Sequence, residues 1–254
     1  MHPTLIEIFG LEISTFGVML AVAFLVGGWM VAASFERSGI GGDLAWRLVT
    51  WGMVGGVVGS KLWFAVEAIA RNPGLPLLEP LLSRGGITWY GGLLGGAALV
   101  LAAAHRARIP LILTMNVAAP ALAIGQALGR IGCFLVGDDY GGPTDLPWGI
   151  AFPEGVDPIS EPVHPTQLYE SAWLGVGGLG LWLRRSRSPF LFAEYLLLQG
   201  VGRLWLETFR TNPSALGPLT NAQVAAVCCI AAGVAGWAWT FTRGPRPLRQ
   251  APPG

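Results

Sequence analysis

The stretch LAIGQALGRIGCFLVG, residues 122–137, decides the fold class, because it is typical of a membrane-spanning helix. It also contains a charged residue, Arg130. A second stretch of the same kind, LLLQGVGRLWLETF at residues 196–209, contains Arg203. A charged side chain at the centre of a transmembrane helix costs roughly 2.5–3.5 kcal/mol on insertion scales, so it is rarely present without a function. Two guanidinium groups at one depth indicate an anion-binding site, and lipid phosphate is the abundant anion there.

The composition is typical of a polytopic membrane protein. Of the 254 residues, 52% are hydrophobic and only 12% are charged. The formal net charge of +1 says nothing about nucleic acid, but the absence of a basic stripe from the sequence gives no reason to expect a nucleic-acid partner. Cys228 and Cys229 are neighbours in an apolar run, so a disulfide framework is not expected. The spacing of the histidines and of Cys133 fits no metal site, and no nucleotide-binding motif is found, so we expect neither a metal nor a cofactor.

The apolar stretches predict an all-α bundle of seven transmembrane helices within a single integral-membrane domain, residues 1–254. Segment 135–166, which carries acidic residues but no Lys or Arg, is predicted to be a small extracytoplasmic region. Arginines gather in alternate connections, which predicts an outside N-terminus and a cytoplasmic C-terminus. The predicted spans are 16–33, 46–69, 90–104, 111–134, 167–183, 190–209 and 220–241.

The predicted topology brings polar residues of several spans to one depth. The fourth and sixth spans both run outward, so Arg130 lies roughly 6 Å and Arg203 roughly 9 Å below the outer ends of their helices. Lys61 falls in the outer half of the second span, and Tyr90 opens the third from the outer side. The heptamer 164–170 opens the fifth span from the same side. No charges gather at the midplane, which disfavours a small-solute transporter.

Arg203, Glu207 and Arg210 follow the spacing i, i+4, i+7 and are predicted to share one helix face. One interpretation is an intramembrane salt bridge that neutralises Arg203 so that the helix can insert. The other adds a function, because a carboxylate partner also fixes the guanidinium for bidentate binding of phosphate. The two interpretations are compatible.

Two glycine-rich motifs have simple structural interpretations. WYGGLLGG, residues 89–96, contains a GxxxG pattern that favours close helix packing, with Tyr90 as an aromatic residue of the membrane interface. GRIGCFLVGDDYGG, residues 129–142, begins as a helix and ends in a Gly/Asp cluster. A helix end followed by a turn explains its glycines, but not an arginine beside an open polar segment, so we favour a functional site there.

The heptamer HPTQLYE, residues 164–170, is read as a helix start. Pro165 is suited to the first helical position, and Gln167 and Glu170 are expected in the first turn. A helix start accounts for Pro165 and Glu170 but not for the whole set of polar side chains. A contribution of this heptamer to the site is therefore also expected.

With these motifs the sequence resembles the bacterial prolipoprotein diacylglyceryl transferase family over nearly the whole chain. The resemblance implies transfer of the diacylglyceryl group of phosphatidylglycerol to the lipobox cysteine thiol of exported prolipoproteins, with release of glycerol phosphate. The implied partners are phosphatidylglycerol, the prolipoprotein signal peptide with its lipobox, and the bacterial inner (cytoplasmic) membrane, which the chain would cross several times. The alternative is a non-catalytic relative that binds phosphatidylglycerol or lipoproteins as a membrane accessory protein.

The resemblance also implies roles for individual residues. Arg130 and Arg203 would clamp the phosphate and stabilise the leaving group, and Glu207 would orient Arg203. Gly141 and segment 138–142 would form the lip of the site. Tyr90 belongs to the catalytic set by position, because the family usually has His there. The other residues implied in substrate binding or bracing are Lys61, Cys133, Asp138, Gly141, His164, Gln167, Tyr169, Glu170 and Gln199.

Several positions depart from the residues usual in the family. The His that Tyr90 replaces is the usual proposed base, and a tyrosine hydroxyl is a poor base for a thiol. Tyr90 is therefore expected to donate a hydrogen bond or to pack. Cys133 and Val136 stand where the family usually has Asn. The remaining departures are Phe16 and Gln199 for Tyr, Lys61 for Arg, Asn116 for an acidic residue and Asp138 for Glu.

Overall fold

The computed structural model describes residues 3–8, 11–83 and 88–243. Long helices form at all the predicted spans. Their bounds are α1 (Thr15–Arg37), α2 (Gly42–Arg71), α4 (Trp89–Arg106), α5 (Leu111–Val136), α6 (Thr166–Arg184), α7 (Leu191–Glu207) and α8 (Asn221–Arg243).

Four of the described helices, α1, α2, α5 and α8, are long and apolar enough to cross a membrane. The mostly helical membrane fold is thus confirmed. Helices α4, α6 and α7 have 18, 19 and 17 residues, slightly fewer than the about 20 apolar residues that a full span needs. The seven-span topology and its orientation stay predictions.

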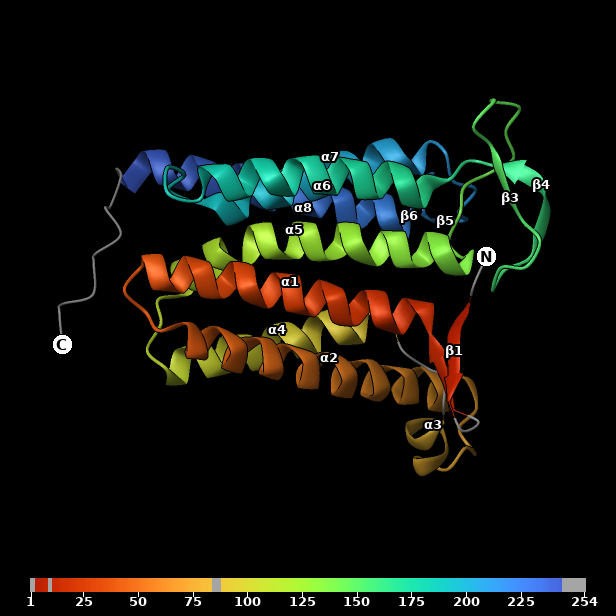
Figure 1. Ribbon diagram of the computed structural model, residues 1–254, viewed down its shortest axis with the longest axis horizontal. Coiled ribbons are helices and arrows are strands. Elements are labelled where there is room, and N and C mark those ends of the chain that lie inside the picture. The colour runs from red at the N-terminus through yellow and green to blue at the C-terminus, as the bar shows by residue number, and fades with distance from the viewer. Residues whose placement is uncertain (1–2, 9–10, 84–87, 244–254) are drawn as a thin grey trace. The chain divides into compact units, whose positions relative to one another are not determined.

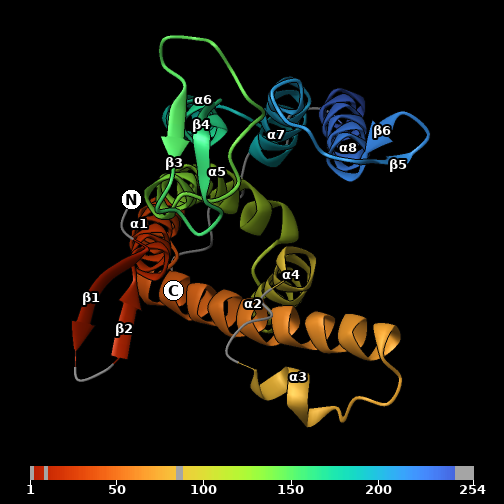
Figure 2. The same cartoon turned by 90° about the vertical axis from the view of Figure 1, so that its right-hand side faces the viewer.

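The chain forms two compact units, one of residues 1–34 with 115–254 and one of residues 35–114. In the first unit, α5, α6, α7 and α8 run side by side (Figure 1), and Figure 2 views them along their axes. Small residues allow these helices to approach closely. A Cβ added at Gly178 of α6 would lie 3.0 Å from Ala123 of α5, and one at Gly200 of α7 would lie 2.6 Å from the carbonyl oxygen of Ala226 of α8.

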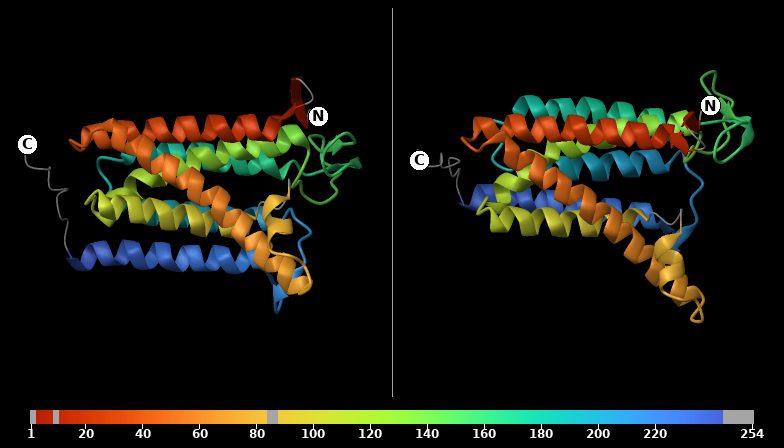
Figure 3. Two further views of the ribbon diagram at one scale, coloured as in Figure 1. Left: turned by 90° about the horizontal axis from the view of Figure 1, so that it is seen from below. Right: turned by 60° about the horizontal axis from the view of Figure 1, so that its bottom comes forward.

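Three short hairpins, which the sequence did not predict, accompany the helices of the first unit. They make the fold mostly helical rather than purely all-α. All three lie at one end of this unit (Figures 1 and 3). They are β1 (Thr4–Ile8) with β2 (Leu11–Ser14), β3 (Ile150–Phe152) with β4 (Ile159–Val163), and β5 (Ser214–Leu216) with β6 (Leu219–Thr220), each pair antiparallel. The second hairpin falls within segment 135–166, for which the sequence predicted an extracytoplasmic place.

In the second unit, α2 and α4 lie side by side (Figure 1), and the short helix α3 (Leu78–Leu82) follows α2. A Cβ added at Gly55 would lie 2.3 Å from the carbonyl oxygen of Gly95, and one at Gly59 would lie 2.2 Å from that of Gly91. Since no side chain fits at such a distance, the close packing predicted for the motif at 89–96 is confirmed.

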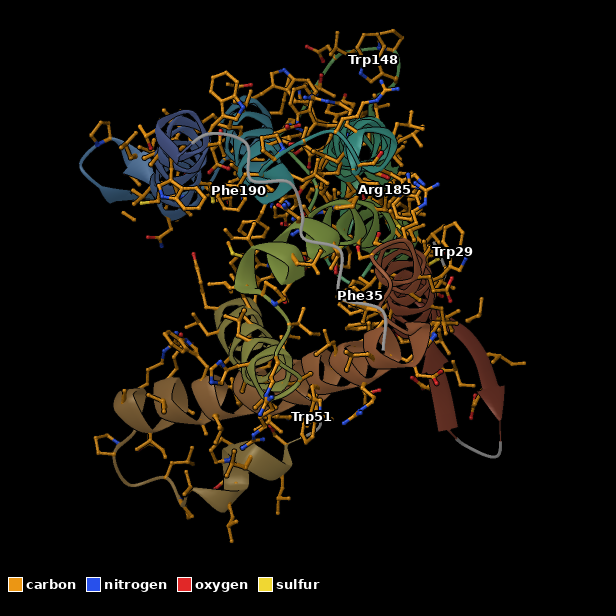
Figure 4. All side chains as sticks on the ribbon, turned by 90° about the vertical axis from the view of Figure 1, so that its left-hand side faces the viewer. Trp29, Phe35, Trp51, Trp148, Arg185 and Phe190 are labelled. Carbon is orange, nitrogen blue, oxygen red and sulfur yellow. The ribbon has the colours of Figure 1, made fainter. Side chains whose placement is uncertain are left out.

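Large apolar side chains cover the outer faces of the helices in the first unit. Trp29 points away from α1 (Figure 4) and is 59% exposed. Leu25 of α1 and Val176 and Leu183 of α6 are also exposed. An apolar exterior of this kind is stable only against lipid, so the packing supports the membrane character that the composition predicted.

Candidate functional site

Arg130 lies in the last two turns of α5 and contacts two carboxylates. Its Nε is 2.8 Å from Oε2 of Glu170 in α6, and one terminal nitrogen forms an ion pair with Asp139. Gly137 ends the helix with a φ of +73°, and the backbone N–H groups of Gly137 and Asp138 both donate to the carbonyl oxygen of Cys133. This turn directs the chain back over the helix end and brings Asp139 to Arg130.

Arg203 of α7 approaches the same carboxylate as Arg130. One terminal nitrogen of Arg203 is 4.0 Å from Oε2 of Glu170, and the other is 3.3 Å from Oε2 of Glu207, one turn later in α7. The structure therefore brings the two arginines together, on either side of a glutamate from α6. The salt bridge predicted between Arg203 and Glu207 is confirmed.

Glu207 is held firmly in place, because its side chain is only 2% exposed. Its Oε1 accepts hydrogen bonds from Oγ1 of Thr220 at 2.6 Å and from Nδ2 of Asn212 at 2.9 Å. A carboxylate fixed in this way also fixes the guanidinium that it faces. The ion pair with Arg203 is therefore held in a fixed geometry, and the preparation of this arginine for an anion stays a prediction.

A third arginine, Arg210, joins this site from beyond the end of α7. The sequence placed it on one helix face with Arg203 and Glu207, but α7 ends at Glu207 and Arg210 turns toward Asp139 instead. It forms an ion pair with the Asp139 carboxylate and donates to the Asp139 carbonyl oxygen at 3.1 Å. Burial lowers the pKa of Arg210 to about 10, with the positive charge of Arg130 as a smaller cause. The guanidinium remains protonated at neutral pH.

The arginines and carboxylates described so far form one group, which we call the arginine–carboxylate cluster. Its cations come from α5, α7 and the segment after α7, and its anions come from the turn after α5, from α6 and from α7. The cluster consists of Arg130, Arg203, Arg210, Asp139, Glu170 and Glu207.

The heptamer 164–170 braces the turn that follows α5. Nε2 of Gln167 donates to the Asp138 carbonyl oxygen at 2.6 Å, and Oγ1 of Thr166 donates to that of Asp139 at 3.3 Å. Helix α6 begins at Thr166, so Pro165 caps the helix instead of occupying its first position. The polar residues of the heptamer therefore serve the site as well as the helix start.

An aromatic layer connects the heptamer to segment 135–166. The hydroxyl of Tyr169 accepts from Nε1 of Trp148 at 2.7 Å and lies 3.4 Å from Nδ1 of His164. The rings of His164 and Phe209 pack with centroids 5.0 Å apart. Among the described residues, His164 and Tyr169 take part in none of the ion pairs of the cluster, and their role as a brace of the site stays a prediction.

Gly141 fills a position that tolerates no side chain. Its N–H donates to the His164 carbonyl oxygen at 2.9 Å. An added Cβ would lie 2.5 Å from the Phe209 carbonyl oxygen and 2.8 Å from Cγ2 of Thr166. Gly141 therefore lets the segment after Asp139 lie directly against the backbone that follows α7.

Asp138 and Cys133 lie next to the cluster. Sγ of Cys133 is 4.0 Å from a terminal nitrogen of Arg130. Oδ1 of Asp138 is buried and has no hydrogen-bond partner among residues 3–8, 11–83 and 88–243. Burial is the main cause that raises the pKa of Asp138 from its ordinary value.

Three predicted site residues have other surroundings. Nε2 of Gln199 donates to the Tyr195 hydroxyl at 2.9 Å and also pairs with Gln126, and these two glutamines precede Arg203 and Arg130 by one helical turn. Lys61 and Tyr90 belong to the second unit. There Nζ of Lys61 donates to the Ser83 carbonyl oxygen at 2.5 Å, and the Tyr90 ring, 48% exposed, meets Trp89 edge-on. Their roles toward a substrate stay predictions.

Sequence reasoning included Asp139 only as part of segment 138–142, the lip of the site, and did not assign Arg210 to the site. The signal for Arg210 was present in its spacing from Arg203, but the helix end at Glu207 changed its direction. Asp139 has a φ of +57°, a left-handed conformation that Asp tolerates better than most residues. In the sequence, only the pair of adjacent acidic residues after the predicted helix indicated that a carboxylate could lie here.

Fold and site together define a helical membrane protein with a cluster of arginines and carboxylates at the end of its helices. The chain belongs to the prolipoprotein diacylglyceryl transferase family, whose model matches residues 3–239. Similar proteins are the phosphatidylglycerol–prolipoprotein diacylglyceryl transferases of Synechococcus elongatus, 34% identical over 94% of this chain and 87% of the relative, and of Nostoc sp., 34% identical over 99% and 93%. That of Clostridium tetani is 30% identical over 92% and 96%.

Proposed function

We propose that this protein transfers the diacylglyceryl group of phosphatidylglycerol to the lipobox cysteine of exported prolipoproteins. The observation that carries the proposal is the convergence of Arg130 and Arg203 on the carboxylate of Glu170, at 2.8 and 4.0 Å. Two guanidiniums beside lipid-facing helices provide what a phospholipid phosphate needs at that depth. The names of the relatives, which share this family, supply the reaction.

The reaction requires a leaving phosphate and a sulfur nucleophile. The lipobox thiol first loses its proton, because the thiolate is the reactive form. Its sulfur attacks the glycerol carbon that carries the phosphate oxygen, so that a C–S bond forms as the C–O bond breaks. The bonding electron pair leaves with the oxygen, and glycerol phosphate departs. Arg130 and Arg203 stabilise the charge that develops on the phosphate without exchanging protons.

The remaining site residues have supporting roles in this proposal. Glu207 orients Arg203, Gln167 holds the turn that carries Asp138, and Gly141 forms the lip of the site. Lys61, Cys133 and Gln199 belong to the wider substrate-binding set. Tyr90 acts as a hydrogen-bond donor or packing group. The arginines lower the pKa of the substrate thiol, so that Glu170, Asp138 or water can take its proton.

The proposed topology has seven transmembrane helices in the bacterial inner membrane, with the N-terminus outside and the C-terminus in the cytoplasm. Its support is the distribution of arginines and the gathering of the three hairpins at one end of the first unit. Single cysteines introduced at Glu154 in the outer segment and at Arg187 between α6 and α7 test it, since both side chains are exposed. A membrane-impermeant thiol reagent applied to intact cells should label only the first. The reverse pattern would overturn the orientation.

The proposal is tested with the purified full-length protein in lipid nanodiscs. Phosphatidylglycerol and a lipobox peptide are supplied, and mass spectrometry looks for the thioether product and for glycerol phosphate. The alternative, an accessory protein, is favoured by Tyr90 and Cys133 at positions where the family usually has His and Asn. Binding of phosphatidylglycerol without any thioether product would support that alternative.

A further inference from the structure

The arginine–carboxylate cluster is electrically balanced before any substrate is present. Its three guanidiniums face three carboxylates, and both contacted nitrogens of Arg130 already have an anionic partner. A guanidinium binds phosphate best when two adjacent N–H groups are free to form parallel hydrogen bonds. A phosphate that binds Arg130 through Nη1 therefore competes with Asp139 for that nitrogen.

The three carboxylates differ in how firmly they are held. The side chains of Glu207 and Glu170 are 2% and 13% exposed and project from the helices α7 and α6. The side chain of Asp139 is 35% exposed and comes from the turn after α5. Asp139 is thus the most accessible of the three and the only one that no helix carries. It is the carboxylate that an incoming anion meets first.

Asp139 also forms an ion pair with a second arginine, Arg210, which can hold it when the contact with Arg130 is lost. One carboxylate oxygen of Asp139 forms an ion pair with Arg130 and the other with Arg210. Arg210 also donates a hydrogen bond to the Asp139 carbonyl oxygen at 3.1 Å. Oγ1 of Thr166 donates to the same carbonyl oxygen. If the contact with Arg130 breaks, the residue therefore remains attached through Arg210 and its backbone.

We propose that Asp139 occupies the place of the lipid phosphate on Arg130 and is displaced when phosphatidylglycerol binds. The inference rests on the proposed function and adds to it a residue that sets the affinity for the headgroup phosphate. Exchanging one anion for another keeps Arg130 neutralised throughout, which matters for a charge at membrane depth. The carboxylate of Asp139 moves onto Arg210 alone, and the phosphate takes the released N–H groups of Arg130.

The substitution Asp139→Asn tests this competition. Asparagine tolerates the left-handed backbone at this position and keeps the size of the side chain, but it removes the charge. The readout is the dissociation constant of glycerol phosphate for the full-length protein in nanodiscs, measured by calorimetry. We expect it to fall roughly tenfold, since a hydrogen bond between charged groups no longer opposes binding. The KM for phosphatidylglycerol should fall by a similar factor.

Asp157→Asn is the matched control. Its side chain is exposed, and its N–H donates to the Gly137 carbonyl oxygen at 3.3 Å, so it lies in the same region and loses the same charge. It should leave the dissociation constant unchanged. If both variants bound glycerol phosphate more tightly by the same factor, the cause would be a general change of electrostatic potential, and the proposal would be overturned.

A purely structural role for Asp139 has a different signature. In that case Asp139→Asn would lower the melting temperature and kcat, while the dissociation constant would stay constant or rise, and the proposal would be wrong. Because glycerol phosphate binding is measured without turnover, this result is separate from the activity. A wild-type protein that binds glycerol phosphate but makes no thioether contradicts the proposed function and leaves the Asp139 test in force.

Discussion

Oε2 of Glu170 lies 2.8 Å from Nε of Arg130, so a carboxylate of α6 neutralises an arginine of α5 inside the bundle. The same oxygen faces Arg203 of α7 at 4.0 Å. Three helices are therefore joined through one oxygen atom. A change in any of the three residues alters both the charge balance and the geometry offered to a phosphate.

Replacing Arg203 by Lys should lower the rate of thioether formation by about 100-fold, the scale of losing one donor to a developing oxyanion. Lysine keeps the charge but lacks the planar pair of N–H groups that a guanidinium offers. Initial rates at saturating phosphatidylglycerol measure the loss. Arg187→Lys, an exposed arginine between α6 and α7, is the control and should keep its full rate. Full activity of Arg203→Lys would contradict the phosphate clamp.

Gly141→Ala should destabilise the protein by about 1–3 kcal/mol, the usual range for overpacking. The new Cβ would lie 2.5 Å from the backbone oxygen of Phe209, which cannot move as a side chain can. Gly180→Ala in α6 is the control, because a Cβ there meets nothing within 4 Å. Thermal unfolding in detergent should separate the two. A Gly141→Ala variant as stable as Gly180→Ala would show that the lip of the site adapts easily.

Asp138 predicts a pH dependence of stability. Burial raises its pKa in the folded protein above the unfolded value, so the fold favours the neutral acid. The contribution of Asp138 to stability is thus present below the unfolded pKa and is lost as the pH rises through the folded pKa. Asp138→Asn should raise the melting temperature at neutral pH and leave it little changed at acidic pH. An equal shift at both pH values would exclude titration of Asp138 as the cause.

Variants of Tyr90 test whether the position where the family usually has His carries the proton transfer. If its hydroxyl only donates a hydrogen bond or packs, Tyr90→Phe should retain most of the activity across the pH range. Rates of thioether formation for Tyr90→Phe and Tyr90→His, followed from acidic to basic pH, provide the comparison. Complete loss in the Phe variant with an intact fold, together with rescue by His, would show that this position carries the proton transfer.

The helices could be predicted from the sequence because each apolar run is long and ends at charged or glycine-rich segments. The meeting of Arg130 and Arg203 also followed from the sequence, since the directions of their spans gave both arginines the same depth. Neither argument depended on tertiary detail.

The contacts of Asp139 could not be predicted in this way. They depend on the left-handed conformation of Gly137 and Asp139. They also depend on the end of α7 at Glu207, after which the chain directs Arg210 toward Asp139. The β3–β4 hairpin could not be predicted from the sequence either. Its strands have only three and five residues, and its register is irregular between Ile150 and Phe152.

The hydrogen bond from Thr220 to Glu207 connects the site to the last helix. Thr220 is the final residue of β6, and α8 begins at the next residue. Any sideways displacement of α8, such as the entry of a lipid between helices would require, therefore pulls on the carboxylate that orients Arg203. If the lipid substrate enters beside α8, its entry would act on the carboxylate that faces Arg203 through the hydroxyl group of Thr220.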